Sequence, residues 1–446
     1  MVRVHTLFAQ ESVIVGDKVR TDVTTDPMAV IYPDNLAALG VCRGLGVKGI
    51  PVTILSADRT APGQYSRYAR RVACPAQADE AEFIEFLLRF GQAHQRYAPV
   101  LFLTDDNAIV TVHRHREILE RWYRFPMASW SVLRRVMLKD HLYRSLDGVV
   151  PLPHTRFPED ESELADAVRE IGGSILVKPL LRCLTGSSDT SSLPFEQCFG
   201  SKAIRVRTLR ELTDAYRAAC ARGFRVVVQE EIEGPISSLY SLGLYATRQG
   251  EVAAAFTSQK LGQVPPDFGD GLVVKAVRAR ELIPLGERVI RHFGYYGMAD
   301  VEFKWDARAG VYKLLDINPR PWLWINLPTA CGVNLSYAAY LDAVGRPIDP
   351  GGFVQRDFET RWVSIRGLLI YVIRSLGTGW RCTGLLPVLR QFWGKRVGPL
   401  FCTKDLLFRM FLSPMYWWDS FLQASRGIRR LHAAPGAING RPFLTE

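Results

Sequence analysis

The sequence predicts a chain of mixed α/β and α+β class: an open parallel-sheet domain, then a two-part α+β region, then a helical, basic C-terminal region. Three observations support this prediction. Apolar strands and helices alternate in residues 1–125, as they do in parallel βαβ units. Strand patterns in residues 126–348 include consecutive pairs, which favours antiparallel pairing. From residue 361 onward the chain consists of apolar, tryptophan-containing pieces interspersed with arginine.

The N-terminal region begins with the order strand, helix, strand. The stretches MAVIYP (28–33) and IPVTIL (50–55) flank a helical segment, and a further strand, VLFLT (100–104), follows a helical segment at 80–95. Strands that are apolar throughout are typical of parallel strands covered on both faces. We therefore predict an open α/β domain that ends near residue 125.

The segment GVCRGLG (40–46) raises a dinucleotide-binding alternative for this region. Its spacing is not GxGxxG, and its glycines lie within and after the expected helix, whereas a phosphate-binding loop opens its helix. We therefore expect these glycines to serve packing. A dehydrogenase that binds NAD(P) here stays as a rival function, although it lacks a phosphate-binding glycine motif.

Residues 126–348 contain two groups of elements. The first, predicted at 126–224, has helices at 129–147, 160–171 and 209–223, strands at 174–180 and 202–208, and a Ser-rich loop between these strands. The second, predicted at 225–348, has strands at 238–247 and 251–259, helices at 281–293 and 327–344, and a hairpin at 301–318. The strand FRVVVQEEIEG (224–234) spans the boundary between the two groups, and a basic region is predicted at 349–446.

The net charge of +11 is concentrated in the C-terminal part. Residues 361–446 carry thirteen Lys or Arg against three acids, a net charge of +10, so residues 1–360 carry +1. Nucleic-acid binding by the whole protein is therefore not indicated. Two interpretations of the tail stay open. One is peripheral contact with an anionic membrane surface, and the other, which we favour, is helices packed on the rest of the protein.

The remaining composition indicates a reduced, cytoplasmic protein. Eight scattered cysteines without a CxxC pair are not typical of a disulfide framework or a zinc site. The N-terminal segment MVRVHTLFAQES has no apolar run long enough for a signal peptide, and no stretch approaches the roughly 18 apolar residues of a membrane span. The oligomeric state stays open, and a dimer is compatible with the sequence. The pair His113 and His115 lies in a charged helical stretch and is expected to be solvated.

The segment VEFKWDARAGVYKLLDINPRP (301–321) carries the strongest chemical signal. Two apolar strands joined by a turn can bring Glu302 opposite Asp316, with Asn318 on the same face as Asp316. Two like charges in this arrangement are unfavourable unless a cation lies between them. Two carboxylates and an amide oxygen suit Mg²⁺ with bound phosphates. The alternative is a structural role, in which Asp316 caps the turn and Glu302 pairs with a lysine.

Several features upstream of the hairpin are weak evidence individually. Lys178 lies in the apolar strand SILVKPL, where an ammonium is unfavourable unless it meets an anion or reaches solvent. Lys139 lies just before a helix. The Ser-rich loop after Lys178 can present amides and hydroxyls to phosphate. The strand end QEEIEG (229–234) can present backbone groups to an adenine edge.

The order of these features resembles the ATP-grasp superfamily of ATP-dependent carboxylate ligases, in particular its predicted carboxylate–amine ligases, akin to carbamoyl-phosphate-synthase-like and D-aspartate-ligase-like proteins. Further matches are QKLGQVPPDFGDG (259–271) and NPRPWLWINLPTACGVNLSYAAYLDAVGRP (318–347). The resemblance covers residues 28 to at least 345. It implies a pre-ATP-grasp domain at 1–125, a small ATP-grasp lobe at 126–224 and a large lobe at 225–348.

The resemblance also implies roles for individual residues. Lys139 and Lys178 would hold the phosphates of ATP, and Lys260 would line the site. Glu302, Asp316 and Asn318 would bind two Mg²⁺ ions, with Mn²⁺ as an alternative metal. Arg320 would act with Lys178 at the transferring phosphoryl group. The hinge over adenine would consist of Gln229, Glu230, Glu231 and Ile232.

The sequence departs from the family pattern at three places that concern the binding of ATP and substrate. Asp316 stands where many ATP-grasp enzymes have Glu. The stretch PISSLYS after QEEIEG lacks an acid that could hold ribose. The loop after Lys178 is rich in Ser instead of Gly, and Gly262 stands where a basic residue is expected in this group.

The implied reaction is ATP-dependent joining of a small-molecule carboxylate to an amine. An acyl phosphate would form first, and the amine would then displace phosphate to give an amide or peptide-like bond. The alternative is a nucleotide-binding regulatory or scaffold protein with the same fold and no ligase activity. The complete set of two acids, Asn and Arg argues against it, because binding alone needs fewer of these groups.

Overall fold

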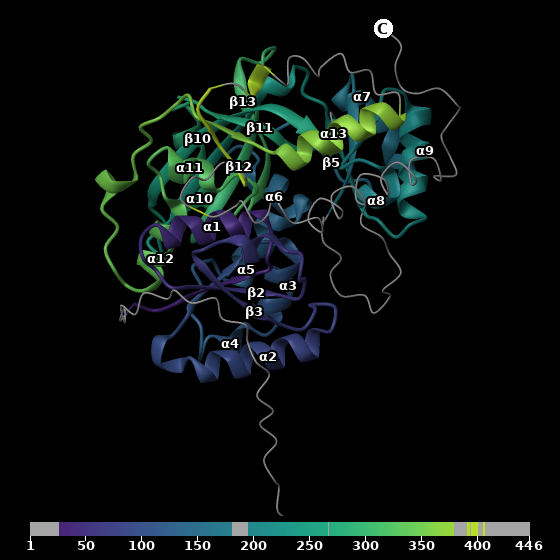
Figure 1. Ribbon diagram of the computed structural model, residues 1–446. Coiled ribbons are helices and arrows are strands. Elements are labelled where there is room, and N and C mark those ends of the chain that lie inside the picture. Colours follow the sequence, from purple (N-terminus) through teal and green to yellow (C-terminus); the bar gives the residue numbers. More distant parts are fainter. Residues whose placement is uncertain are drawn as a thin grey trace, which may run out of the picture.

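The computed structural model describes residues 26–180, 195–265, 267–378, 390–392, 394–399 and 405. These residues form a four-stranded parallel sheet, a four-stranded antiparallel sheet and a seven-stranded, mostly antiparallel sheet (Figure 1). The predicted combination of an α/β domain with α+β units is therefore confirmed.

The N-terminal domain is built on the parallel sheet, which has the strand order β3-β2-β1-β4. Its main elements are β1 (Ala29–Tyr32), α1 (Leu36–Gly46), β2 (Val52–Ser56), β3 (Ala69–Ala73), α2 (Glu80–Ala93), β4 (Val100–Leu103), α3 (Asp106–Arg114) and α4 (Arg116–Leu119). Strands β1, β2 and β4 are buried along their whole length, as expected for parallel strands covered on both faces. Strand β3 was not predicted, because its two arginines interrupt the apolar pattern.

Helix α1 packs against the helices that follow the hairpin, and its glycines permit this close approach. A Cβ atom at Gly40 would lie 2.5 Å from Cγ2 of Ile325, and one at Gly44 would lie 2.9 Å from Oδ1 of Asn334. The amide of Asn334 also donates a hydrogen bond to the carbonyl of Gly44 at 2.7 Å. The packing role predicted for GVCRGLG is therefore confirmed.

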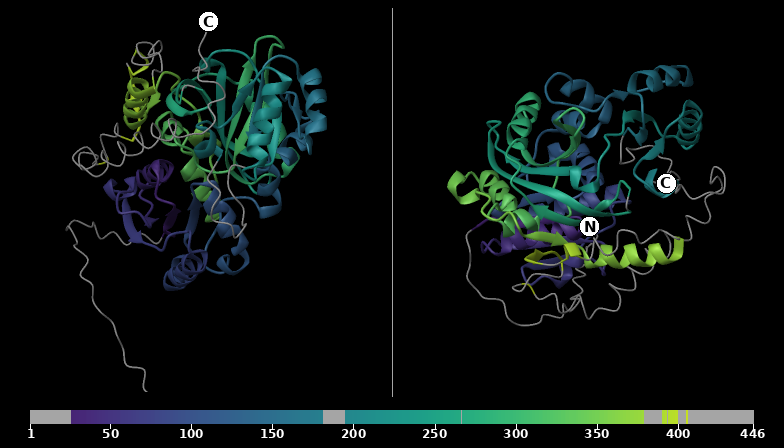
Figure 2. Two further views of the ribbon diagram at one scale, coloured as in Figure 1. Left: turned by 90° about the vertical axis from the view of Figure 1, so that its right-hand side faces the viewer. Right: turned by 90° about the horizontal axis from the view of Figure 1, so that it is seen from above.

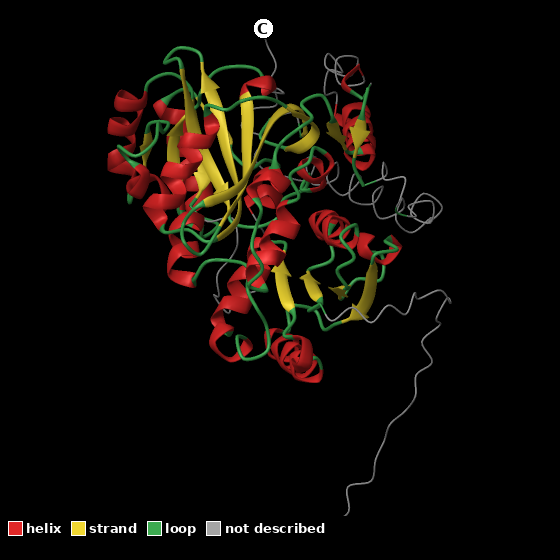
Figure 3. Cartoon of the chain, turned by 90° about the vertical axis from the view of Figure 1, so that its left-hand side faces the viewer, coloured by secondary structure: helices red, strands yellow, loops and turns green. Residues whose placement is uncertain are grey.

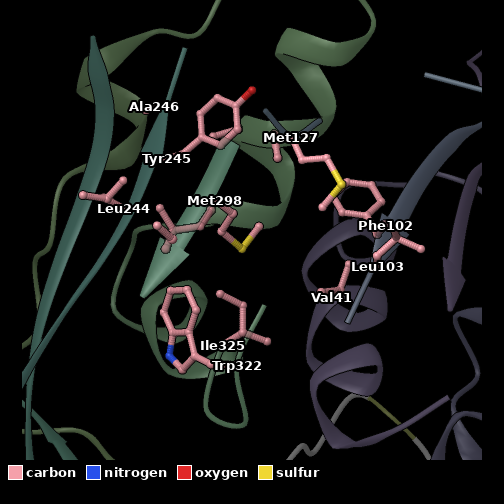
Figure 4. Close-up of a cluster of buried hydrophobic side chains, with 14 of the residues drawn as sticks. Val41, Phe102, Leu103, Met127, Leu244, Tyr245, Ala246, Met298, Trp322 and Ile325 are labelled. Carbon is pink, nitrogen blue, oxygen red and sulfur yellow. The ribbon is translucent and has the colours of Figure 1, made fainter. Parts of the chain in front are cut away.

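A continuous apolar core joins the N-terminal domain to the seven-stranded sheet. Figure 4 shows Val41 of α1 with Phe102 and Leu103 of β4 on one side of this core, and Leu244 and Met298 of the large sheet on the other. Ile325, which precedes α11, belongs to the same core. This shared core fixes the carboxyl end of β4 relative to the hairpin.

The small lobe has its own sheet, β5-β8-β6-β7, and a separate core. Helices α5 (Trp130–Met137) and α6 (Lys139–Leu146) lead into β5 (Thr155–Arg156), α7 (Leu164–Ile171), β6 (Ile175–Pro179), α8 (Phe195–Phe199), β7 (Ile204–Val206), α9 (Leu209–Cys220) and β8 (Val226–Glu230). Figure 2 shows this lobe beside the large sheet. Strand β8 belongs to the small-lobe sheet, so the lobe boundary expected at 224/225 falls inside that sheet.

The large lobe contains the third sheet, whose long strands are drawn in yellow in Figure 3. The strand order of this sheet is β13-β12-β9-β10-β11-β14-β15. Its elements are β9 (Leu239–Ala246), β10 (Val252–Val264), β11 (Asp270–Ala276), α10 (Leu282–Phe293), β12 (Gly297–Asp306), β13 (Val311–Asn318), α11 (Asn326–Ala330), α12 (Leu335–Ala343), β14 (Arg361–Val363), α13 (Ile365–Thr378) and β15 (Arg396–Val397). Helices α10 and α12 pack against β9 and β10. The predicted hairpin is confirmed as β12 and β13.

Two helices predicted as continuous are each divided into two. Between α5 and α6, Leu138 adopts an extended backbone with φ −84° and ψ 118°. Between α11 and α12, Gly332 has φ +99°, in the left-handed region that glycine tolerates. The first division arises from one extended residue and the second from a short turn, and an apolar periodicity reveals neither.

The described part of the C-terminal region packs on the rest of the protein. Strand β14 pairs with β11, and α13 contacts β10. Asp405, which is buried, accepts hydrogen bonds from Arg43 Nε at 2.7 Å and from the backbone N–H of Arg67 at 2.8 Å. These contacts support the packed interpretation, although the segment 406–430 lies outside the described residues. Within the described ranges, no helix is long and apolar enough to cross a membrane.

His113 is buried, and the expectation that it is solvated is wrong. Its Nδ1 donates to the carbonyl of Ile109 at 2.9 Å, and Arg116 Nη1 donates to its Nε2 at 2.8 Å. Burial and the charge of Arg116 lower the pKa of His113 to about 4. The neighbouring His115 is half-buried, with Nε2 2.9 Å from Glu80.

Candidate active site

A cavity of about 250 Å³ lies between the small lobe and the large sheet. Strands β6, β7 and β8 line it on one side, and β9, β10, β12 and β13 line it on the other. Most residues selected from the sequence meet here: Lys139, Lys178, Gln229, Glu230, Glu231, Ile232, Lys260, Glu302 and Asp316. Asn318 contacts Glu302 beside the cavity, and Arg320 follows two residues later.

The hairpin places its two acids opposite each other, as the spacing predicted. Glu302 on β12 pairs with Asp316 on β13, and the next pair on the same face is Asp300 with Asn318. A bulge at Leu315 follows the first pair, and bulges are common where a strand directs side chains into a site. The hairpin therefore presents three carboxylates and one amide on one face.

Lys139, the first residue of α6, reaches this face. Its Nζ lies 3.1 Å from Oδ1 of Asp316, and the two side chains are 7% and 12% exposed. The backbone N–H of Lys139 donates to the carbonyl of Leu180 at 3.2 Å, which ties α6 to the end of β6. Lys139 is therefore held beside the hairpin by an ion pair and by a backbone hydrogen bond.

Lys178 on β6 is positioned by a neutral side chain. Its Nζ donates to Oε1 of Gln229 at 2.7 Å, and the amide of Gln229 donates to Oγ1 of Thr155 at 2.8 Å. Because Gln229 is uncharged, this contact orients the ammonium without neutralising it. Gln229 is fully buried, so its side chain supports Lys178.

The glutamates of the predicted hinge are engaged within the protein. Glu230 accepts from Nζ of Lys313 at 2.9 Å. Glu231 accepts two hydrogen bonds from Arg205, both at 2.7 Å, and one from Ser174 at 2.6 Å. Burial alone would raise the pKa of Glu231, but the donors Arg205 and Ser174 hold it below its ordinary value. The neighbouring side chain of Ile232 is buried.

Arg320 lies between the hairpin and the N-terminal domain. Its Nε donates to Oδ1 of Asp106 at 2.6 Å, and its Nη2 lies 3.3 Å from Oδ2 of the same carboxylate. Asp106 is the first residue of α3, which follows β4 of the parallel sheet. The N-terminal domain therefore fixes the position of the guanidinium. Across the site, Nζ of Lys260 lies 5.9 Å from the ring centre of Trp324.

Sequence reasoning missed several residues at this site. Asp300 is 1% exposed, and burial together with the charge of Glu302 raises its pKa to about 7. Its position two residues before Glu302 on the same strand face was the available signal. Lys202, Arg205 and Lys304 also line the cavity. Lys304 lies two residues after Glu302 on β12, so both side chains lie on the same face of the strand. Burial lowers the pKa of Lys304.

The donor set fits a hard divalent cation bound together with phosphate. Glu302 and Asp316 supply carboxylate oxygens, and Asn318 supplies an amide oxygen. Over the ranges that the structure describes, no group of three or more His, Cys, Asp or Glu side chains could hold a metal ion. A cation at the hairpin therefore depends on the oxygen of Asn318 and on oxygens of a bound phosphate.

No protein-family model matches the sequence. The chain is 23% identical over 294 residues to D-aspartate ligase from Enterococcus faecium (strain Aus0004). This alignment covers 63% of the chain and 68% of the ligase.

Solved structures show the same fold at low sequence identity. One is the biotin carboxylase domain of 2-oxoglutarate carboxylase from Hydrogenobacter thermophilus, with a TM-score of 0.57, 16% identity and coverage of 75% of this chain and 72% of that chain. Another is N5-carboxyaminoimidazole synthetase from Staphylococcus aureus in complex with ADP, with a TM-score of 0.56, 14% identity and coverage of 73% and 78%. The fold is therefore that of the ATP-grasp enzymes, as the sequence resemblance implied.

Proposed function

We propose that this protein is an ATP-dependent carboxylate–amine ligase that uses Mg²⁺ and forms an amide or peptide-like bond through an acyl phosphate. The observation that carries the proposal is the cross-strand pair of Glu302 and Asp316 at the cavity. Asn318 lies beside this pair, and Lys139 and Lys178 line the same cavity. The similarity to a D-aspartate ligase supports this reaction class. It does not fix the carboxylate or the amine.

The proposed roles follow from the geometry of the cavity. Lys139 and Lys178 would hold the phosphates of ATP, and the hinge from Gln229 to Ile232 would contact adenine through its backbone. When bound, Mg²⁺ would neutralise phosphate oxygens at Glu302, Asp316 and Asn318. Lys260 would line the same site.

Arg320 would act where the substrate carboxylate meets the phosphoryl group. Its guanidinium can hold an anion in a bidentate geometry, as it holds Asp106 in this structure. The substrate carboxylate attacks the γ-phosphoryl group, a bond to ADP breaks, and the amine then displaces phosphate with loss of a proton. Both partners of the first step are anions, so the contribution of the protein is largely electrostatic and positional.

The function is tested by ATP-dependent release of ADP over crossed panels of carboxylates and amines, with mass spectrometry of the products. We expect ADP release that requires both a carboxylate and an amine and that matches the amount of amide formed. Tight ATP binding without ADP release over a broad panel would contradict the ligase and indicate a nucleotide-binding regulatory or scaffold protein.

The C-terminal region is proposed to pack on the catalytic lobes, and peripheral contact with an anionic membrane is the alternative. Its support is the pairing of β14 with β11 and the buried ion pair of Asp405 with Arg43. Sedimentation of the full-length protein with anionic and with neutral vesicles separates the two. Cosedimentation with anionic vesicles at physiological salt would contradict the packed interpretation. Light scattering of the same sample would decide whether the protein is a dimer.

A further inference from the structure

Asp300 has a place in the site that the proposed roles do not explain. It lies two residues before Glu302 on β12, so both side chains point to the same face, and its cross-strand partner is Asn318. Its side chain is almost completely buried. A buried carboxylate is unfavourable unless hydrogen-bond donors or a cation compensate it.

Two uncharged donors hold Asp300 in place. The hydroxyl of Ser241 on β9 donates to Oδ1, and the amide nitrogen of Asn318 lies 3.4 Å from Oδ2. Gly243 is the partner of Asp300 on β9, and a Cβ atom there would lie 2.4 Å from the ring of Trp322. Asp300 is therefore enclosed between β9 and β13, and its partner Gly243 leaves room for the ring of Trp322.

The same amide nitrogen of Asn318 lies 3.0 Å from Oε1 of Glu302. An amide NH₂ group carries two hydrogens, and Asn318 directs one toward each carboxylate. The carbonyl oxygen must then lie on the opposite edge of the amide. A reversed amide would place this oxygen against two carboxylates, which is electrostatically unfavourable.

We propose that Asp300 is a positioning residue: together with Ser241 it fixes the amide of Asn318, so that the carbonyl oxygen is free to bind the divalent cation. This inference rests on the proposed function, because it requires a cation at Glu302, Asp316 and Asn318. Asp300 is not itself assigned as a ligand, since no three His, Cys, Asp or Glu side chains of the described residues converge on a metal position.

The test separates metal-dependent from metal-independent nucleotide binding in the full-length protein. Titration calorimetry gives the affinity for a non-hydrolysable ATP analogue once in EDTA and once with saturating Mn²⁺, and the ratio is the metal enhancement. Asp300→Asn removes the charge that selects the amide orientation of Asn318. We expect the enhancement to fall about tenfold, in line with other residues that support metal ligands. A role in folding alone would weaken binding equally with and without the metal.

Asp306→Asn is the matched control. Asp306 lies on the same strand and is also buried, although less deeply than Asp300, and its partner is Lys313 at 2.9 Å and not Asn318. This variant is expected to keep the wild-type enhancement. Ser241→Ala is a second test, because it removes only the hydroxyl that holds Asp300. Ser241→Ala is expected to reduce the metal enhancement by a smaller factor than Asp300→Asn. If Asp300→Asn does not fold, Ser241→Ala alone tests the positioning role of Asp300.

The outcomes distinguish this inference from the proposed function. An unchanged enhancement in both Asp300→Asn and Ser241→Ala, or an equal loss of affinity in EDTA and in Mn²⁺, would overturn the positioning role and leave the proposed function standing. A wild-type protein that binds the analogue equally well with and without Mn²⁺ would contradict the cation site, and the inference would fall with it.

Discussion

The ammonium of Lys139 lies 3.1 Å from Oδ1 of Asp316, and this ion pair joins the start of α6 to β13. The residue proposed to hold phosphate therefore neutralises a residue proposed to hold the cation. Binding of a nucleotide with its metal would give Lys139 a phosphate and Asp316 a cation. The pair keeps both charges compensated before the ligands arrive.

Lys139→Met is expected to lower the unfolding free energy by about 3 kcal/mol, because removing one member of a buried ion pair leaves the other charge uncompensated. The double variant Lys139→Met/Asp316→Asn is expected to recover most of this loss. Urea unfolding of the wild type, both single variants and the double variant measures the coupling. Additive effects of the two substitutions would show that the ion pair does not contribute to stability.

Glu302→Gln and Asp316→Asn are each expected to lower ATP turnover at least about a hundredfold while the fold is kept, because the loss of a metal ligand removes several kcal/mol of charge stabilisation. Steady-state ADP release measures this, and circular dichroism checks the fold. The control is Asp306→Asn on the same hairpin. Wild-type turnover in either site variant would rule out the assigned metal ligands.

Arg320→Lys is expected to lower turnover about a hundredfold, because lysine cannot reproduce the bidentate geometry of a guanidinium. Nucleotide affinity is expected to stay within about twofold of wild type, since Arg320 contacts Asp106 of the N-terminal domain. Kinetics and calorimetry on one preparation provide both values. A parallel loss of ATP affinity would place Arg320 in nucleotide binding instead.

His113 gives the stability a defined pH dependence. Its pKa is about 4 in the folded protein, below the ordinary value of 6.5, so the unfolded chain binds more protons between these values. The contribution of neutral His113 to the unfolding free energy is therefore fully present above pH 6.5 and is lost as the pH falls toward 4. At pH 5 we expect the unfolding free energy to be about 2 kcal/mol lower than at neutral pH because of this histidine.

The measurement for His113 is urea unfolding of wild type and His113→Gln at pH 7.5 and pH 5. The difference between the two proteins isolates the histidine from buried acids such as Asp34, whose raised pKa acts in the opposite direction. A difference in unfolding free energy that does not change with pH would contradict the assignment of His113 as a neutral, buried side chain.

The hairpin was predictable because strand periodicity and residue spacing place Glu302 opposite Asp316 without knowledge of the rest of the fold. The order of the motifs along the chain, with Lys139 and Lys178 upstream of the hairpin, then linked these two lysines to the same site. By contrast, the partners of Glu231 and Arg320 come from other elements, Arg205 on β7 and Asp106 on α3. Such long-range pairs leave no local pattern.

Burial explains the remaining differences from the sequence predictions. Histidine and charged residues in α3 and α4 suggest a solvated helix, yet packing buries His113. The strand spacing places Asp300 on the same face as Glu302, but its hydrogen-bond donor Ser241 comes from β9, about 60 residues earlier in the sequence, and no local pattern reveals that contact. The positions that sequence reasoning missed are mainly those that acquire their partners from tertiary packing.

The acyl-phosphate mechanism can be tested by following the oxygen of the carboxylate substrate. Once a substrate pair is found, the carboxylate is labelled with ¹⁸O and the phosphate released with ADP is examined by mass spectrometry. An acyl phosphate transfers one carboxylate oxygen to phosphate, so we predict phosphate that carries one ¹⁸O atom for each amide formed. Unlabelled phosphate would mean that water attacks ATP, which would contradict the ligase mechanism.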